Sequence, residues 1–254
     1  MTGIEYFDLY QEMRTHQRDH HNSLWSLLGD QQNPQEHCTE CLLEKAHTSN
    51  PADIPERASL RKHYSWAIPN EEALDVIAKH SPHGVVEIGA GGGYWATLLQ
   101  QRGVDVVAYD PAPENSKWHH GTWTVVHSGD HRVAADHPTR TLLLCWPSYR
   151  EPWAAKALEY YAGDTVIYIG EGCGGCTGDN RFHALLGNSP HCSHYDDDYN
   201  TLPCPHDCLS KLPPRFEQVE NVDIPQWFGL HDGLRVYRRL TLTEGQRTRQ
   251  STVG

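Results

Sequence analysis

The sequence predicts an α/β fold centred on a parallel sheet, and three adjacent features predict it. An apolar run at residues 85–88 is typical of a buried strand, and glycines follow it directly. Apolar residues at helical spacing then continue to Gly103, a residue that suits the end of a helix. A second apolar run, residues 104–109, ends on Asp110. Strand, glycine turn, helix, strand and acid together form a βαβ unit of the kind that binds nucleotides.

The spacing of the glycines indicates which nucleotide such a unit would bind. A dinucleotide turn needs a small residue at its third position, where helix and strand pack closely, and here that position is Tyr94. The pattern present is an acid followed by alternating glycines: Glu87, Gly89, Gly91 and Gly93. This pattern resembles the first motif of the class I S-adenosylmethionine-dependent methyltransferases. A glycine-rich turn without a ligand is the alternative.

The resemblance implies a doubly wound, Rossmann-like sheet of seven strands and S-adenosylmethionine as the cofactor. The glycines would let the backbone approach the cofactor, and Asp110 would bond both ribose hydroxyls, because a carboxylate accepts what two hydroxyls donate. The expected cofactor-binding residues are Glu87, Gly89, Ala90, Gly91, Tyr94, Asp110, Pro111, Asp130, His131 and Cys145.

Composition narrows the classes of function. A chain of 254 residues with a formal net charge of −12 is a poor partner for nucleic acid. No apolar run has membrane-spanning length and the N-terminus lacks a secretory pattern, which predicts a cytoplasmic protein. We expect a helical N-terminal segment at 1–60, a cofactor-binding domain at 61–243 and a disordered tail at 244–254. The sequence leaves the oligomeric state open.

The N-terminal segment carries an apolar stripe. Ile4, Phe7, Tyr10 and Met13 recur at three-residue steps, and the helical pattern extends to about residue 30. Helices at this end often cover the substrate in small-molecule methyltransferases. The segment is therefore either a lid or a helix packed permanently on the sheet.

Aromatic residues precede the first strand. Asn70 is a good N-cap for a helix that leads into that strand, so Tyr64 and Trp66 arrive near the expected cofactor site. They are candidate substrate-binding residues that would wall the methyl-transfer site. Plain packing under the N-terminal helices is the alternative.

The third strand is predicted at Thr122–His127 and is followed by Gly129-Asp130. Class I methyltransferases often place an acid after this strand, where it accepts from the adenine amino group. Asp130, with His131, is therefore a candidate adenine ligand. A surface turn is the other interpretation, since Gly-Asp is common turn chemistry.

The fourth strand, residues 141–145, runs into Trp146-Pro147-Ser148-Tyr149. This tetrapeptide is similar to the Asp/Asn-Pro-Pro-Tyr/Phe motif of amino-methylating enzymes, but Trp146 replaces the polar head and Ser148 replaces a proline. The departure weakens an assignment of amine methylation. Trp146 could pack on a sulfonium or a flat substrate, and Tyr149 could orient or deprotonate the acceptor. An ordinary strand end with an aromatic cover is the alternative.

A helix at 152–161 and a fifth strand at 164–169 lead into a glycine-rich loop at the same edge of the sheet. Glu171 in this loop is a candidate catalytic residue. Cys173 and Cys176 form a Cys-x-x-Cys pair, but redox motifs of this type normally open a helix, which argues against redox catalysis.

Residues 188–214 form a Cys/His-rich insertion without regular periodicity. Cysteines of a cytoplasmic protein are more often thiols or metal ligands than disulfides. We predict one structural zinc bound by Cys38, Cys41, Cys204 and Cys208, stapling two segments that have little apolar surface. Free surface thiols are the alternative, and a catalytic zinc with an open position is a further one.

Two final strands, residues 216–221 and 235–240, fit the antiparallel sixth and seventh strands of the class I fold. The sequence thus predicts a methyltransferase that acts on the N, O or S atom of a small molecule, in specialised metabolism. One alternative is an enzyme that consumes the same cofactor without methylation, for example by cyclisation of its aminobutyrate arm. Another is a non-catalytic binding module with a zinc-stapled partner surface.

Overall fold

The computed structural model describes residues 4–12, 14, 57–114, 118–188, 213–227 and 230–241. Residues 5–12 are helical. The later elements are α3 (Arg57–His63), α4 (Glu71–Lys79), β1 (Val85–Ile88), α5 (Tyr94–Gln101), β2 (Val106–Asp110), β3 (Val126–Ser128), the 3-10 helix η2 (His131–Asp136), β4 (Thr141–Cys145), α6 (Trp153–Tyr160), β5 (Thr165–Gly170), α7 (Asn180–Leu185), β6 (Phe216–Asp223) and β7 (Gly233–Arg239).

The seven strands form one mixed sheet in the order β3-β2-β1-β4-β5-β7-β6. The first five are parallel, and β7 pairs antiparallel with both β5 and β6. This is the Rossmann-like sheet predicted for the class I fold, including its two antiparallel last strands. Because parallel strands end at the same edge, β1, β2, β4 and β5 deliver their last residues to one side of the molecule.

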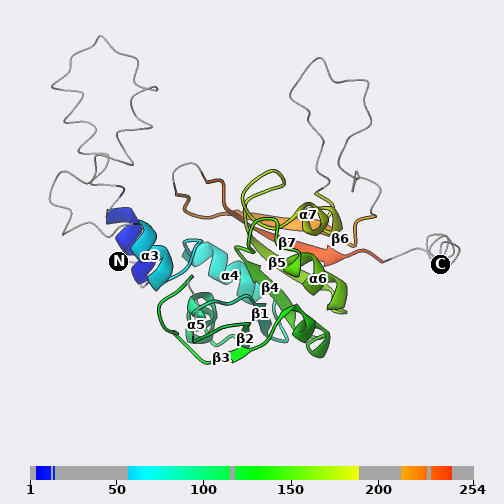
Figure 1. Cartoon of the computed structure of the whole chain (residues 1–254), viewed down its shortest axis with the longest axis horizontal. Coiled ribbons are helices and arrows are strands. Elements are labelled where there is room, and N and C mark those ends of the chain that lie inside the picture. Colours follow the sequence, from blue (N-terminus) through cyan, green and yellow to red (C-terminus); the bar gives the residue numbers. More distant parts are fainter. Residues whose placement is uncertain are drawn as a thin grey trace, which may run out of the picture.

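Helices cover both faces of the sheet (Figure 1). The alternation of side chains along β1 divides the core, since Val85 belongs to one apolar cluster and Val86 to the other. Helices α4 and α5 pack in the first cluster, and α6 and α7 pack in the second. The described residues contain no helix that is both long and apolar enough to cross a membrane.

Residues 5–12 pack against the first of these clusters. Ile4, Tyr6 and Tyr10 are buried there, whereas Phe7, a member of the predicted stripe, is only partly buried. Tyr6 stacks on Tyr64 with ring centroids 4.8 Å apart. In this structure the helix is therefore packed on the core. The remainder of the predicted N-terminal helical region lies outside the described residues.

The predicted boundaries of the third strand were wrong. Residues 122–127 were the expected strand, but β3 spans only Val126–Ser128. The backbone N–H of Trp123 instead donates to the carbonyl of Gly92 (2.7 Å), and that of His120 donates to Lys62 (2.8 Å). These bonds draw the chain away from β2 and across the glycine turn. The described part of the β2–β3 connection contains no helix.

Candidate functional site

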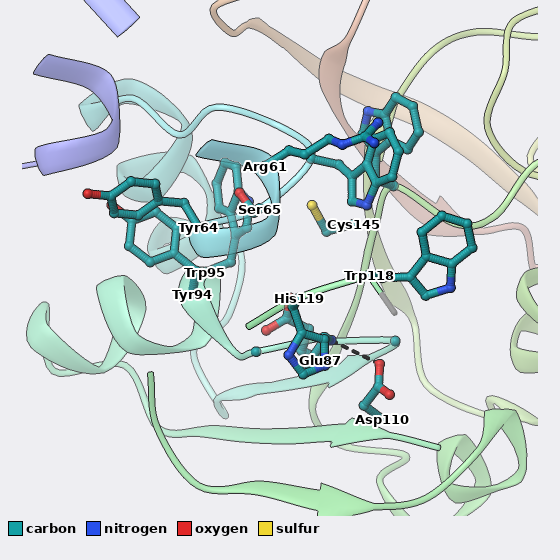
Figure 2. Close-up of a pocket in the computed structure, with 16 residues that line it drawn as sticks. Arg61, Tyr64, Ser65, Glu87, Tyr94, Trp95, Asp110, Trp118, His119 and Cys145 are labelled. Atoms are coloured by element: carbon teal, nitrogen blue, oxygen red, sulfur yellow. Dashed lines mark hydrogen bonds between the residues drawn. The ribbon is translucent and has the colours of Figure 1, made fainter. Parts of the chain in front are cut away.

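A cavity opens where β1, β2 and β4 end (Figure 2). The space among its lining residues is about 630 Å³, a volume that includes the part open to solvent. The structure brings many of the predicted residues together on its wall: Tyr64, Trp66, Glu87, Gly89, Ala90, Gly91, Tyr94, Asp110, Cys145 and Trp146.

The glycine turn forms the floor of the cavity. Gly89, Gly91 and Gly93 all have positive φ, a conformation that side chains disfavour. A Cβ at Gly89 would meet the Trp153 ring at 2.6 Å, so close packing beneath the turn also requires glycine there. At Gly91 the nearest atom to such a Cβ is 3.5 Å away, on His119. Gly91 therefore presents bare backbone to the cavity.

Asp110 stands beside this turn at the end of β2. One carboxylate oxygen accepts from the backbone N–H of Gly91 (3.0 Å) and the other from Ala112 (2.9 Å). A carboxylate has about four acceptor positions, so both oxygens retain capacity for another donor. Asp110 can thus shape the turn and still accept from a ligand's hydroxyls.

Glu87 is the second carboxyl group in the cavity. It is 1% exposed, and its Oε2 has no hydrogen-bond partner. Burial raises the pKa of Glu87 to about 8, because removal from water disfavours the charged form, and the nearby Asp110 adds to the effect. A positively charged group in the cavity would favour the ionised carboxylate.

Unpartnered polar atoms gather at this cavity. Within the described ranges, buried side-chain atoms without a hydrogen-bond partner include Nε of Arg61, Oε2 of Glu87, Nε1 of Trp95 and Nε2 of His119, all on lining residues. Buried polar groups are normally satisfied, so each such atom needs an explanation. Two are donors, and the other two can accept. Together they suit a ligand that carries both donors and acceptors.

Aromatic side chains close one side of the cavity. Tyr64 stacks on Trp123 at 5.4 Å and meets Tyr94 edge-on at 5.0 Å. Burial raises the pKa of Tyr94 to about 12, so its hydroxyl stays protonated at neutral pH. Tyr64 lines the cavity and also packs under the N-terminal helix through its stack on Tyr6.

A second aromatic group lies where β4 ends. Trp146 stacks on Trp66 at 4.5 Å, and the guanidinium of Arg61 lies 4.2 Å from the centroid of the Trp66 ring. Trp146 adopts a positive φ of 52° and donates from Nε1 to Asp232 (2.9 Å). A strained conformation fixed by a stack and a hydrogen bond gives the indole one defined position. Cys145 lies next to it, and burial raises the pKa of its thiol well above the ordinary value.

Several predicted residues do not line the cavity. Tyr149 is 51% exposed, with the guanidinium of Arg150 over its ring. Pro111 lies on the surface. Asp130 caps η2 and forms an ion pair with Arg132, whose hydrogen bonds lower the pKa of the Asp130 carboxyl. His131, which follows it, lies near Tyr160 (ring centroids 5.7 Å apart).

Glu171 is buried in the loop after β5 and does not line the cavity either. Its oxygens accept from the backbone N–H groups of Cys176 (2.6 Å) and His231 (3.0 Å). Burial by itself would raise the pKa of Glu171, but these donors outweigh it and hold the pKa below its ordinary value. In this structure Glu171 ties the glycine-rich loop to the segment before β7.

The cysteines divide between described and undescribed parts of the chain. Cys145, Cys173 and Cys176 are free thiols. Burial raises the pKa of the Cys173 thiol. Burial, together with a hydrogen bond of the Cys176 thiol itself to Glu171, raises the pKa of that thiol to about 12, so neither cysteine is an activated thiolate. The four predicted zinc ligands (Cys38, Cys41, Cys204 and Cys208) lie outside the described residues, within which no group of three or more metal-ligating side chains occurs.

Six lining residues were not predicted from the sequence: Arg61, Ser65, Gly92, Trp95, Trp118 and His119. Trp95 lies two positions beyond the last glycine of the motif, and only its apolar character was noted there. Trp118 and His119 belong to the β2–β3 connection, which has no periodicity that would predict its path. Only the density of aromatic and titratable residues there was a usable signal.

Residues 60–159 match the family described as a methyltransferase domain, and all the cavity-lining residues fall within this range. A comparison with curated proteins finds no match. The similar solved structures include magnesium protoporphyrin IX methyltransferase from Synechocystis PCC 6803 with bound S-adenosylmethionine (12% identity, TM-score 0.40, covering 67% of this chain and 77% of that one). They also include 1,6-didemethyltoxoflavin-N1-methyltransferase from Burkholderia thailandensis (16% identity, TM-score 0.36, 67% and 78% covered).

Proposed function

We propose that this chain is a class I S-adenosylmethionine-dependent methyltransferase that methylates a small-molecule acceptor. The match of residues 60–159 to a methyltransferase domain and the strand order of the sheet support this proposal. The observation that carries the proposal is the cavity at the glycine turn. It combines bare backbone at Gly91, a carboxylate at Asp110 and the unpartnered atoms of Arg61, Glu87 and Trp95.

These residues fit the chemistry of the cofactor. Asp110 would accept from the ribose hydroxyls with the capacity that its two backbone bonds leave free. Glu87 would face positive charge, which the ammonium or sulfonium group supplies. Arg61 and Trp95 are donors that suit the carboxylate end of the amino-acid arm. S-adenosylmethionine, when bound, supplies an electrophilic methyl group on a sulfonium sulfur.

The acceptor would enter beside the stacked indoles. Trp66 and Trp146 line the cavity where β4 ends, next to the thiol of Cys145. Flat aromatic walls orient a small acceptor and exclude water, and alignment alone can supply a large part of the rate enhancement of such a transfer. Tyr149 and Glu171 lie outside the cavity, which supports acceptor contacts by Trp66 and Trp146 instead. A cytoplasmic location and a role in specialised metabolism remain part of the proposal.

Calorimetry with S-adenosylhomocysteine tests the cofactor assignment. We expect binding to the native protein and a loss of about tenfold or more in Asp110→Asn, which keeps one acceptor oxygen for the turn but removes the charge. Asp136→Asn, an exposed acid outside the cavity, is the matched control and should bind normally. Absence of binding to the native protein would refute the proposal.

Product analysis tests the reaction. Turnover with an acceptor should yield S-adenosylhomocysteine and a methylated product. Methylthioadenosine without any methylated product would instead support use of the aminobutyrate arm. Cofactor binding without turnover of any acceptor would favour the binding-module alternative.

A further inference from the structure

The imidazole of His119 lies in the cavity although it comes from the β2–β3 connection (Figure 2). Two backbone hydrogen bonds hold the part of this connection that follows His119. His120 N–H donates to the carbonyl of Lys62 at 2.8 Å, and Trp123 N–H donates to that of Gly92 at 2.7 Å. The indole N–H of Trp123 also donates to His63 (2.7 Å). The residues that directly follow His119 are thus anchored to α3 and to the glycine turn, and this holds His119 over the turn.

The hydrogen bonding of the ring defines which nitrogen is available. Nδ1 lies 2.9 Å from the carbonyl oxygen of Gly121. A carbonyl oxygen only accepts, so Nδ1 carries the proton, and in the neutral ring Nε2 is an acceptor. The side chain is 8% exposed, and Nε2 has no partner among the described residues. A buried acceptor of this kind is costly unless a donor meets it.

The donor can be identified from what surrounds Gly91. The His119 ring lies 3.5 Å from the position that a Cβ at Gly91 would take, and Asp110 accepts from the Gly91 N–H at 3.0 Å. Asp110 therefore bonds Gly91, beside which a ribose is expected, and the His119 ring lies across the open space next to this glycine. Each Asp110 oxygen already accepts one backbone bond. A vicinal diol offers two donors, and His119 adds a second acceptor group.

We propose that His119 Nε2 accepts a hydrogen bond from one ribose hydroxyl of the bound cofactor and shares the diol with Asp110. This inference rests on the proposed function, because it needs an adenosyl ligand in the cavity. His119 is a binding residue in this assignment, and no proton transfer is required of it. Its contribution should be visible in affinity without any turnover.

The test is a thermodynamic cycle that combines changes in the protein with changes in the ligand. The affinity of each ligand for each variant is measured by competition against S-adenosylhomocysteine. The ligands are adenosine, 2′-deoxyadenosine and 3′-deoxyadenosine. His119→Asn keeps a donor near the Nδ1 position but removes the acceptor at Nε2, and His119→Gln restores an acceptor there. His120→Asn is the matched control, since its side chain is exposed. Non-additive losses identify a direct contact.

We expect His119→Asn to bind S-adenosylhomocysteine and adenosine about tenfold more weakly than the native protein. One of the two deoxyadenosines should bind the native protein about tenfold more weakly than adenosine, and that difference should vanish in His119→Asn. His119→Gln should recover part of the affinity, and His120→Asn should match the native protein. The ratio between ligands is taken within one variant, so partial loss of folded protein does not change it.

Two results would overturn the inference. The first is that His119→Asn discriminates between adenosine and each deoxyadenosine by the same ratio of affinities as the native protein does. This would show that the ring contacts neither hydroxyl. Tighter binding of S-adenosylhomocysteine by His119→Asn would show that the imidazole occupies space the ligand needs. If the native protein binds S-adenosylhomocysteine, either result removes only the role of His119. If the native protein does not bind it, the proposed function itself fails.

Discussion

Glu87 is a buried carboxyl group whose titration makes the stability of the folded protein depend on pH. Its pKa of about 8 in the folded protein lies far above the ordinary 4.5 because the group is removed from water. Between these values the folded state holds a proton that the unfolded state has lost. Stability therefore falls as pH rises from about 4.5 to about 8.

Glu87→Gln should remove this pH dependence, because a neutral amide of the same shape replaces the titrating group. We expect the free energy of unfolding of the native protein to fall between pH 5 and pH 8 by up to a few kcal/mol more than that of Glu87→Gln. Urea denaturation at the two pH values measures the difference. Glu217→Gln, at an exposed carboxylate, should retain the native pH dependence. If the free energy of unfolding changed equally with pH in Glu87→Gln and in the native protein, Glu87 would not be a buried, protonated group.

Glu171 is the opposite case, a buried carboxylate with its donors in place. Glu171→Gln would present an amide N–H₂ to the backbone donor of Cys176 or His231, so one bond to a charged acceptor is lost. We expect a loss of about 1–3 kcal/mol in the free energy of unfolding. Since Glu171 does not line the cavity, the affinity for S-adenosylhomocysteine should be unchanged. A loss of affinity with native stability would restore the sequence-based assignment of Glu171 to the active site.

The glycine turn between β1 and α5 is the element on which the cavity depends. Two of its glycines are constrained by neighbours that come from distant parts of the chain. A Cβ at Gly89 would meet Trp153 of α6, and one at Gly93 would meet Val126 of β3 at 2.8 Å. The turn thus joins the two faces of the sheet, and its shape depends on packing as well as on local conformation.

Gly89→Ala and Gly103→Ala separate these two contributions. Both glycines have positive φ, but a Cβ at Gly103 would have no atom within 4 Å. Both variants should therefore lose about 1–2 kcal/mol for the left-handed conformation. Gly89→Ala should lose roughly a further 1–3 kcal/mol from the contact with Trp153, and it should weaken cofactor binding. Urea denaturation and calorimetry test this, and equal losses in the two variants would argue against the contact.

The success of sequence reasoning at this turn depended on the range of the interactions. The path from β1 to Asp110 is set by an apolar run, glycines and a helical pattern, all of which lie within adjacent residues. His119 was missed because bonds to Lys62 and Gly92 determine where its segment runs. For Glu171 the correct edge of the sheet was predicted, but the donors that turn its carboxylate away from the cavity come from other positions.

At the scale of the whole molecule, the elements that flank the two cysteine-rich segments pack in different core clusters. Residues 15–56 join the N-terminal helix to α3, and both of these contribute to the core cluster that contains Val85. Residues 189–212 join α7 to β6, whose Leu185 and Phe216 belong to the other cluster. One zinc shared by the two segments would therefore join parts of the chain whose flanking elements pack in different clusters.

Chain length permits such a site. Extended chain spans up to about 3.3–3.6 Å per residue, so Cys204 can lie roughly 30 Å from residue 213, and Cys41 roughly 50 Å from residue 57. We predict one zinc per chain, bound by four thiolates contributed by both segments. Elemental analysis of the purified protein should give a ratio near one, and Cys38→Ser or Cys204→Ser should each abolish it. Cys173→Ser, which alters a free thiol outside the proposed set, should retain the metal.

The single-variant pattern distinguishes a shared site from two separate ones. If each segment bound its own metal, Cys38→Ser would leave the metal at Cys204 and Cys208 in place, and the ratio would fall only partly. A shared tetrahedral site loses its metal when either half is broken, because two thiolates alone bind zinc weakly. Chelation should then lower the melting temperature of the native protein and leave that of Cys38→Ser unchanged. If the native protein contained no zinc after purification without chelators, the prediction would be wrong.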